Sequence, residues 1–232
     1  MTELILRNKD ILADLEKVRD AVYPKMNLLN DVGGHFEYVD SKMPYNREDL
    51  KLNEKFVSEE YLKKHMSDPE HIGFPIEYYA HPLDQHSDRG LDHHGAFKEI
   101  VKFAKGDFIA NLGANSDAVF TYYPKGGGVG WHTNQNNSGY QFIFSWSEKG
   151  DGYFQYYDKK KEEIVKIPDV AGWQVRCYHF GEEKEDHCWH SAYTNVPRIT
   201  ICALFRWWDK PHMKEQILAM KDQLIEDIES EI

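Results

Sequence analysis

The second half of the chain is a series of eight short segments rich in Tyr, Phe, Val, Ile and Trp, separated by turn-forming residues. Aromatic and β-branched side chains pack well on a pleated surface, whereas Gly, Pro, Asn and Asp favour turns. Short strands at this spacing predict a barrel or a double-sheet jelly roll. The predicted strands are 117–123, 129–133, 139–147, 152–157, 163–167, 172–180, 187–193 and 198–207.

Amphipathic helices are predicted on both sides of this strand series. Apolar residues recur every three or four positions between Asn8, a predicted N-cap, and Pro24, a predicted helix terminator. Near the other end, Asp209 is expected to cap a helix that has Pro211 in its first turn. Shorter helices are predicted at 58–64 and 95–108.

The expected fold class is α+β with a mainly β core. We expect the 232 residues to form one domain, because no internal repeat, low-complexity tract or clear linker interrupts the chain. Its expected parts are a helical and loop extension over 1–114, a double-stranded β-helix core over 115–208 and a C-terminal helix over 209–232.

The composition narrows the class of ligand. A formal net charge of −11 repels a polyanion, so nucleic acid is not expected, and a small molecule, an amino acid or a basic peptide is the favoured substrate. The three cysteines show no CxxC spacing, which favours a reducing, cytoplasmic compartment. No secretory signal and no apolar run of membrane-spanning length is apparent, so no membrane partner is expected.

One part of the strand series carries residues suited to a metal site. His132 lies on the predicted strand 129–133 and Asn134 directly follows that strand; two residues separated by one position in extended backbone are expected to point the same way. His190 lies on a distant strand, and Arg198 follows it by eight residues. Two imidazoles and a carboxylate can hold one face of Fe(II) and leave the other face open, and an arginine fork binds carboxylates. Here the third ligand position holds an amide.

This order of residues resembles the Fe(II)/2-oxoglutarate-dependent oxygenases, whose core is a double-stranded β-helix. The family pattern is His-x-Asp, a distal His, and then Arg-x-Ser or Arg-x-Thr, which Arg198 and Thr200 match. Tyr123 and Gly126 are similar to the Tyr-x-x-Gly of the alkylation-repair branch. The resemblance covers roughly residues 115–207, and short phage-encoded members are the most similar, which places the expected setting in a phage-infected host.

The resemblance implies an oxygenase that uses Fe(II), 2-oxoglutarate and O2. The co-substrate is decarboxylated to succinate while a substrate C–H bond is hydroxylated. The implied site residues are His132, Asn134 and His190 for the metal, with the two histidines as the catalytic residues, and Arg198, Tyr123 and Thr200 for 2-oxoglutarate.

Several alternatives stay open at this stage. His187 is a second candidate for the distal ligand, with Asp186 beside it as a carboxylate, although the spacing to Arg198 favours His190. Asn134 is compatible with weak ligation through its carbonyl, with space for water or an anion, or with lost catalysis; the last makes the chain a ligand- or protein-binding module. A cupin-type metal enzyme is disfavoured because His-x-His near a Glu is missing. The His-rich segment 81–94 suggests a lid over the barrel more than a second metal site.

Overall fold

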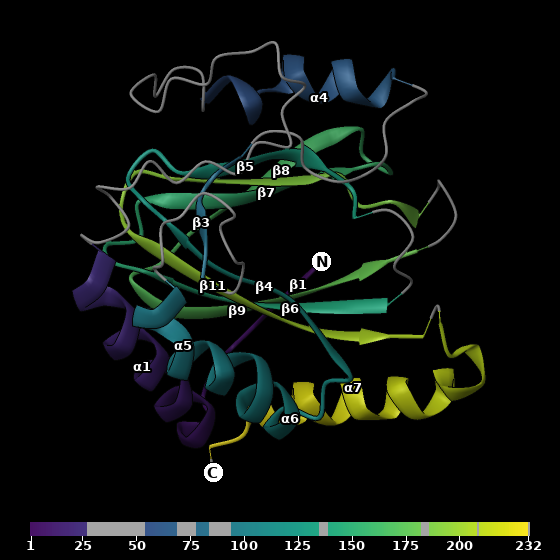
Figure 1. Ribbon diagram of the computed structural model, residues 1–232. Helices are drawn as coiled ribbons and strands as arrows, with labels where there is room; N and C mark the ends of the chain where they lie inside the picture. Colours follow the sequence, from purple (N-terminus) through teal and green to yellow (C-terminus); the bar gives the residue numbers. More distant parts are fainter. Residues whose placement is uncertain are drawn as a thin grey trace.

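Two antiparallel β-sheets pack face to face, with helices on their outer faces, in the computed structural model (Figure 1). The structure describes residues 1–26, 54–68, 78–83, 94–134, 139–181, 186–207 and 209–231. Within these parts of the chain, no helix is long and apolar enough to cross a membrane.

The β core follows the order expected of a jelly roll. Its larger sheet contains the strand order β9-β6-β11-β4 and its smaller sheet the order β5-β10-β7-β8, so that most consecutive strands alternate between sheets. This topology confirms the predicted α+β fold with a mainly β, double-stranded β-helix core. The core strands are β4 (Ser116–Tyr123), β5 (Gly128–His132), β6 (Gly139–Ser147), β7 (Gly152–Asp158), β8 (Glu163–Pro168), β9 (Gly172–Phe180), β10 (His190–Thr194) and β11 (Arg198–Arg206).

Seven of these strands lie within a residue or so of their predicted bounds. The exception is β10, which begins at His190 and not at 187. The N-terminal segment also contributes strands that the sequence pattern did not predict: β1 (Thr2–Leu4) pairs with β9, β2 (Tyr78–Tyr79) with β5, and β3 (His81–Pro82) with β4.

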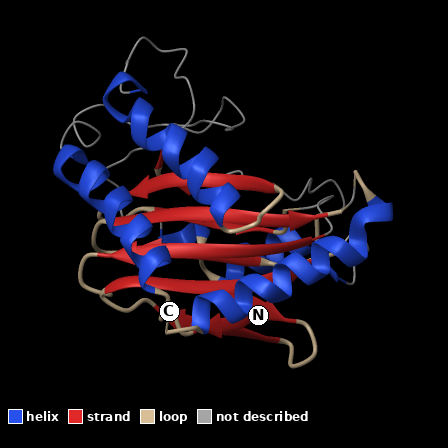
Figure 2. Ribbon diagram, turned by 90° about the horizontal axis from the view of Figure 1, so that it is seen from below, coloured by secondary structure: helices blue, strands red, loops and turns tan. Residues whose placement is uncertain are grey.

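Helices cover the outer face of the larger sheet (Figure 2). They are α1 (Lys9–Val22), α5 (His94–Lys102), the π-helix η2 (Phe103–Phe108), α6 (Ile109–Asn111) and α7 (Lys214–Glu229), with 3₁₀ turns at Tyr23–Lys25 and Pro211–Met213. Their apolar residues and the outer-face residues of the sheet form one core cluster, which includes Leu15, Phe108, Phe144 and Leu224. This layer buries the outer face of the larger sheet.

Helix-start signals in the sequence succeed at one end of the chain and fail at the other. The side chain of Asn8 accepts hydrogen bonds from the backbone N–H groups of Asp10 and Ile11, as predicted for an N-cap. The prediction that Asp209 caps the C-terminal helix is wrong. Pro211 opens a 3₁₀ turn instead, and α7 starts three residues later without a side-chain cap.

Helix α4 (Glu59–Met66) packs on the outer face of the smaller sheet. The indole Nε1 of Trp131 donates to the backbone oxygen of Ser58 at 2.9 Å, and Trp131 and Trp189 pack with Leu62 in a separate apolar cluster. Each tryptophan immediately precedes a histidine of the predicted site. Because neighbouring side chains on a strand point to opposite faces, the outward tryptophans direct His132 and His190 inward.

Candidate metal and carboxylate site

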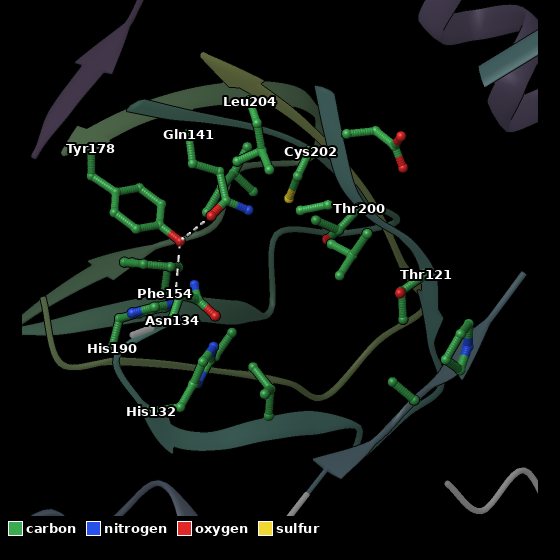
Figure 3. Close-up of a pocket in the computed structure, with 18 of the residues that line it drawn as sticks. Thr121, His132, Asn134, Gln141, Phe154, Tyr178, His190, Thr200, Cys202 and Leu204 are labelled. Atoms are coloured by element: carbon green, nitrogen blue, oxygen red, sulfur yellow. Dashed lines mark hydrogen bonds between the residues drawn. The ribbon is translucent and has the colours of Figure 1, made fainter. Parts of the chain in front are cut away.

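A cavity of about 450 Å³ lies between the two sheets. Residues of both sheets line it, and Figure 3 shows part of this wall. Six of the predicted site residues are in the wall: Tyr123, His132, Asn134, His190, Arg198 and Thr200. The structure therefore brings together residues that are distant in the chain; the first, Tyr123, and the last, Thr200, are 77 positions apart.

His132 and His190 are direct partners across the antiparallel pair β5–β10. Their ring centroids are 4.0 Å apart. The register shifts between His190 and Ala192, where β5 has one residue more than β10. This bulge explains why Val129 and His132, three positions apart, both line the cavity.

The two imidazoles share one hydrogen-bonding pattern. Nδ1 of His132 lies 2.8 Å from the backbone oxygen of Gly130, and Nδ1 of His190 lies 2.8 Å from that of Cys188. A carbonyl oxygen can only accept, so each Nδ1 carries a proton, and in the neutral ring Nε2 presents a lone pair. Metal-binding histidines are typically held in this way.

Burial keeps His190 neutral. Loss of solvent lowers the pKa of His190 to about 4, against a smaller opposing effect of its bond to Cys188. At neutral pH its Nε2 therefore does not need to lose a proton before it binds a metal ion.

Asn134 reaches the same place by a different route from the one predicted. It lies beyond the end of β5, with a φ of 53°, a left-handed conformation that Asn tolerates better than most residues. Its Nδ2 is 3.2 Å from Nε2 of His190. A half-turn of the amide exchanges Nδ2 and Oδ1, so the carbonyl oxygen can take this position facing the histidines.

Tyr178, on β9, is a site residue that the sequence analysis missed. Its hydroxyl oxygen lies 3.1 Å from Nε2 of His190 and 2.9 Å from Oε1 of Gln141 (Figure 3). Burial raises its pKa well above the usual value, so it is a neutral phenol at neutral pH. Period-two alternation in 172–180 could have placed it on an inner face, but no local signal pairs it with His190.

Arg198 opens β11 and is 2 % exposed. Its Nη2 donates to Oγ of Ser145 at 3.2 Å, and its guanidinium carbon lies 5.6 Å from the ring centroid of Tyr123, its partner across β4–β11. Thr200, two residues further on, lies 3.3 Å from the same Ser145 through its hydroxyl. In this corner of the cavity, the hydroxyl groups of Ser145 and Thr200 therefore lie close to the guanidinium of Arg198.

Arg198 also forms an ion pair with a buried carboxylate, Asp169, which is not among the described residues that line the cavity. Oδ2 of Asp169 is 3.5 Å from Nε of Arg198, and Oδ1 accepts from Nη1 of Arg176 at 3.2 Å and from Nε2 of Gln174 at 2.9 Å. The side chain of Asp169 is fully buried, and that of Arg176 is 1 % exposed. Burial and the nearby Arg198 lower the pKa of Arg176. One carboxylate thus serves two arginines, a cluster that the sequence did not indicate.

Tyr123 is held as a neutral phenol beside Arg198. Burial raises its pKa to about 12, although the positive charge of Arg198 acts in the opposite direction. Its hydroxyl is therefore available as a hydrogen-bond donor at neutral pH.

The remaining wall is mostly apolar. Its residues include Val129, Ile143, Phe154, Phe180 and Ala192. Charged side chains also appear on the wall at Asp117 and Arg206, on the inner face of β4 and β11. The cavity thus combines polar ends with an apolar middle.

The competing candidates lie elsewhere. His187 precedes β10, is half-buried and is not among the described residues that line the cavity, and Asp186 is exposed. Of the His-rich segment, His81 lies in β3, whereas 84–93 are outside the described residues. Among the parts of the chain that the structure describes, no three His, Cys, Asp or Glu side chains gather into a metal-binding group.

The donor set nevertheless fits a divalent metal ion. Two imidazoles, each with Nδ1 held by a backbone oxygen, and one amide group converge on one end of the cavity, and imidazole and carbonyl donors suit Fe(II) and its neighbours. What the set lacks is an anionic ligand, because Asn134 stands where a carboxylate would supply one.

Comparison with known proteins finds similarity to solved structures. No protein-family model matches the chain, and no curated protein matches it. Similar solved structures include a Pseudomonas putida prolyl-4-hydroxylase, with 16% identity, a TM-score of 0.32, and coverage of 55% of this chain and 67% of that one. A predicted oxalate decarboxylase of Thermotoga maritima has 19% identity, a TM-score of 0.26, and coverage of 42% and 70%. The cobalt(II) form of HppE with substrate has 13% identity, a TM-score of 0.22, and coverage of 37% and 42%. These scores are too low to carry over an activity or a ligand.

Proposed function

We propose that the chain is an Fe(II)- and 2-oxoglutarate-dependent oxygenase that hydroxylates a small molecule, an amino acid or a peptide. One observation carries the proposal: a buried arginine and two histidines with inward Nε2 atoms face the same cavity. An oxygenase of this class needs both a metal-binding end and a carboxylate-binding end within reach of one small co-substrate.

At the metal end, His132 and His190 hold the ion through Nε2, and Asn134 adds its amide oxygen or a water. When bound, the iron with 2-oxoglutarate and O2 supplies the oxidising chemistry. The backbone oxygens of Gly130 and Cys188 fix both rings by accepting from Nδ1, so neither imidazole has to reorient when the ion arrives.

At the other end, Arg198 binds the distal carboxylate of 2-oxoglutarate. Ser145 and Asp169 hold two edges of the guanidinium, so its orientation is set before the ligand arrives. Tyr123 donates its phenolic hydrogen and Thr200 its hydroxyl hydrogen to carboxylate oxygens. Apolar side chains such as Phe154 and Ile143 exclude water between the two ends.

The decisive test is an anaerobic titration of the purified protein with Fe(II) and 2-oxoglutarate, followed by the visible metal-to-ligand charge-transfer band. We expect a saturable band that His132→Ala abolishes. Arg198→Ala should keep the band but weaken 2-oxoglutarate binding by about tenfold to a hundredfold or more, as for a lost charged hydrogen-bonded partner. Full-strength binding in Arg198→Ala would remove that residue from the site.

A second candidate function is a non-catalytic binding module on the same barrel. It is favoured by the neutral amide of Asn134, which leaves the metal end without a carboxylate. The two functions differ in turnover: the oxygenase forms succinate from 2-oxoglutarate and consumes O2, whereas the module binds without either. A protein that gives the charge-transfer band but forms no succinate with any tested substrate class supports the module.

A further inference from the structure

The cavity wall along β11 has two ends. Arg198 and Leu204 both line the cavity from this strand. A strand rises about 3.4 Å per residue, so roughly 20 Å of strand separates the two positions. In the pairing of β6 with β11, Gln141 lies opposite Leu204, whereas Ser145 lies opposite Thr200. Gln141 therefore marks the end of the cavity that a five-carbon diacid bound to Arg198 leaves open.

The side-chain amide of Gln141 is held in one orientation. Gln141 is 5% exposed, and its Oε1 accepts the hydroxyl hydrogen of Tyr178 at 2.9 Å. Because Oε1 is engaged by Tyr178, the amide nitrogen is the other end of the group, and Figure 3 shows it directed into the cavity. Gln141 therefore presents a hydrogen-bond donor to the interior.

This donor has capacity for a ligand. The amide nitrogen of Gln141 carries two hydrogens. The side chain also forms a hydrogen bond with the sulfur of Cys202, which is a weak acceptor and 1% exposed. Among the described residues, no further acceptor contacts this nitrogen, so one N–H remains for a bound molecule.

The surroundings of this amide are apolar. Its two partners, Tyr178 and Cys202, belong to a buried apolar cluster whose other members on the cavity wall include Ile143, Phe154, Phe180 and Leu204. A buried donor that finds no partner costs free energy. Such a wall therefore selects a ligand that is apolar along most of its surface and has an acceptor opposite Gln141.

The charged side chains at this end of the wall already have partners. Oδ2 of Asp117 pairs with Nζ of Lys105, and Arg206 also has an interaction partner. Neither residue can receive an incoming charge without giving up part of a contact. Transfer of a charged group into an apolar chamber is costly without a matched partner, which favours an uncharged ligand.

We propose that this end of the cavity is the substrate chamber, and that Gln141 is a specificity-determining residue that donates to one oxygen of an otherwise apolar substrate. The inference rests on the proposed function and names its substrate class: an uncharged small molecule or side chain with a carbonyl, ether or hydroxyl oxygen. The hydroxyl of Tyr178 lies between this amide and Nε2 of His190, so the bound group lies beside the metal end. Tyr178 is a positioning residue, because it acts through Gln141.

The experiment titrates the full chain, with its glutamine side chains labelled with ¹⁵N, against acetophenone and α-methylstyrene. The two probes have the same shape, but a CH2 group in the second replaces the carbonyl oxygen of the first. In the wild type, acetophenone should move one glutamine side-chain proton signal downfield, as a hydrogen bond does, and α-methylstyrene should not.

Gln141→Leu should remove that signal and reduce the ratio of the acetophenone affinity to the α-methylstyrene affinity. The expected reduction is about threefold to tenfold, the value of a neutral hydrogen bond. Ile143→Val is the matched control on the same strand. It alters the apolar wall without touching a donor, so the ratio should stay as in the wild type.

The outcomes separate this inference from the function on which it rests. Binding of neither probe to the wild type, or an equal affinity ratio in the wild type and Gln141→Leu, overturns the inference. If Gln141→Leu does not fold, the wild-type spectra decide, and the absence of a downfield shift with acetophenone overturns it. These titrations contain no iron or 2-oxoglutarate, so their failure leaves the oxygenase proposal intact. Selective binding of acetophenone without a charge-transfer band would retain the chamber and overturn the oxygenase.

Discussion

The hydroxyl oxygen of Tyr178 lies between Nε2 of His190 and Oε1 of Gln141, at 3.1 and 2.9 Å. A phenol has one hydrogen to donate, so in the metal-free protein it can satisfy only one of these two acceptors at a time. The structure gives this hydrogen to Gln141, and Nδ2 of Asn134 lies within hydrogen-bonding distance of Nε2 of His190. Tyr178 therefore links Gln141 to the metal end, and no sequence motif predicts this contact.

Tyr178→Phe should destabilise the metal-free protein by about 1–3 kcal/mol, because the buried Gln141 oxygen loses its donor. The measurement is urea unfolding in the presence of a chelator. Tyr140→Phe is the control, since Tyr140 lies on the same sheet but points to its outer, helix-covered side near Lys221. Equal stability of Tyr178→Phe and the wild type would contradict the hydrogen bond.

Stability of the metal-free protein should fall with acidity between pH 6.5 and about 4. The folded-state pKa of His190 is lowered to about 4, so in this range the unfolded chain binds a proton that the folded chain excludes. Above pH 6.5 the imidazole is neutral in both states and causes no loss of stability, and the loss grows to on the order of 3 kcal/mol by pH 4.

Urea midpoints measured across this range check the effect. Carboxylates also titrate there, so the comparison is with His190→Gln, whose stability should change less steeply with pH. Parallel profiles for the two proteins would mean that His190 is not the buried neutral group described above.

Asp169→Asn should destabilise the fold by about 3–5 kcal/mol, since it leaves two buried guanidinium groups without their shared carboxylate. Thermal or urea unfolding measures the loss. Asp222→Asn is the control. The side chain of Asp222 is 65% exposed and pairs with Lys221, so its loss should cost less than about 1 kcal/mol. A similar small effect for both variants would show that Asp169 does not compensate the arginines.

Arg176→Gln should weaken 2-oxoglutarate binding although Arg176 is not among the described residues that line the cavity. Asp169 is one carboxylate shared by two arginines. Without Arg176, the charge of Asp169 fully compensates that of Arg198, so less positive charge remains to attract the carboxylate of the ligand. The expected loss is about tenfold, which corresponds to about 1.4 kcal/mol of electrostatic attraction. Calorimetric titration with 2-oxoglutarate in the presence of Mn(II) measures it.

Arg176→Lys keeps the charge and is the matched variant for this prediction. It should retain most of the affinity, whereas a purely structural role of the guanidinium predicts that Lys and Gln are equally poor. An affinity unchanged in Arg176→Gln would refute the long-range effect.

Much of the fold could be read from the sequence because its signals are local. Turn residues between aromatic and β-branched runs set the strand bounds, and the spacing of apolar residues set the helix faces, as Asn8 and Leu15 illustrate. The prediction of the helix start failed at the C-terminal helix, where the same residues are compatible with an α-helix and with a 3₁₀ turn. Asp209 and Pro211 offered a plausible helix start, yet the chain makes a 3₁₀ turn first.

The site was predictable only in part, for the same reason. The order of His132, His190 and Arg198 along the chain predicted a shared site, and the structure places all three on one cavity. Asn134 joins them through a left-handed turn after β5 and not through strand alternation. The choice between His187 and His190 also depended on where β10 begins, which the residue pattern placed three positions too early.

The sequence by itself determined which segments form strands, which side chains of a strand share a face, and which residue types are available for a metal and a carboxylate. Only the tertiary structure decided which of these faces meet. Tyr178 and Gln141 come to His190, and Asp169 to Arg176 and Arg198, through pairings between strands that are distant in the chain. Local spacing fixes the direction of a side chain, but its partners depend on long-range strand order, which short-range periodicity does not encode.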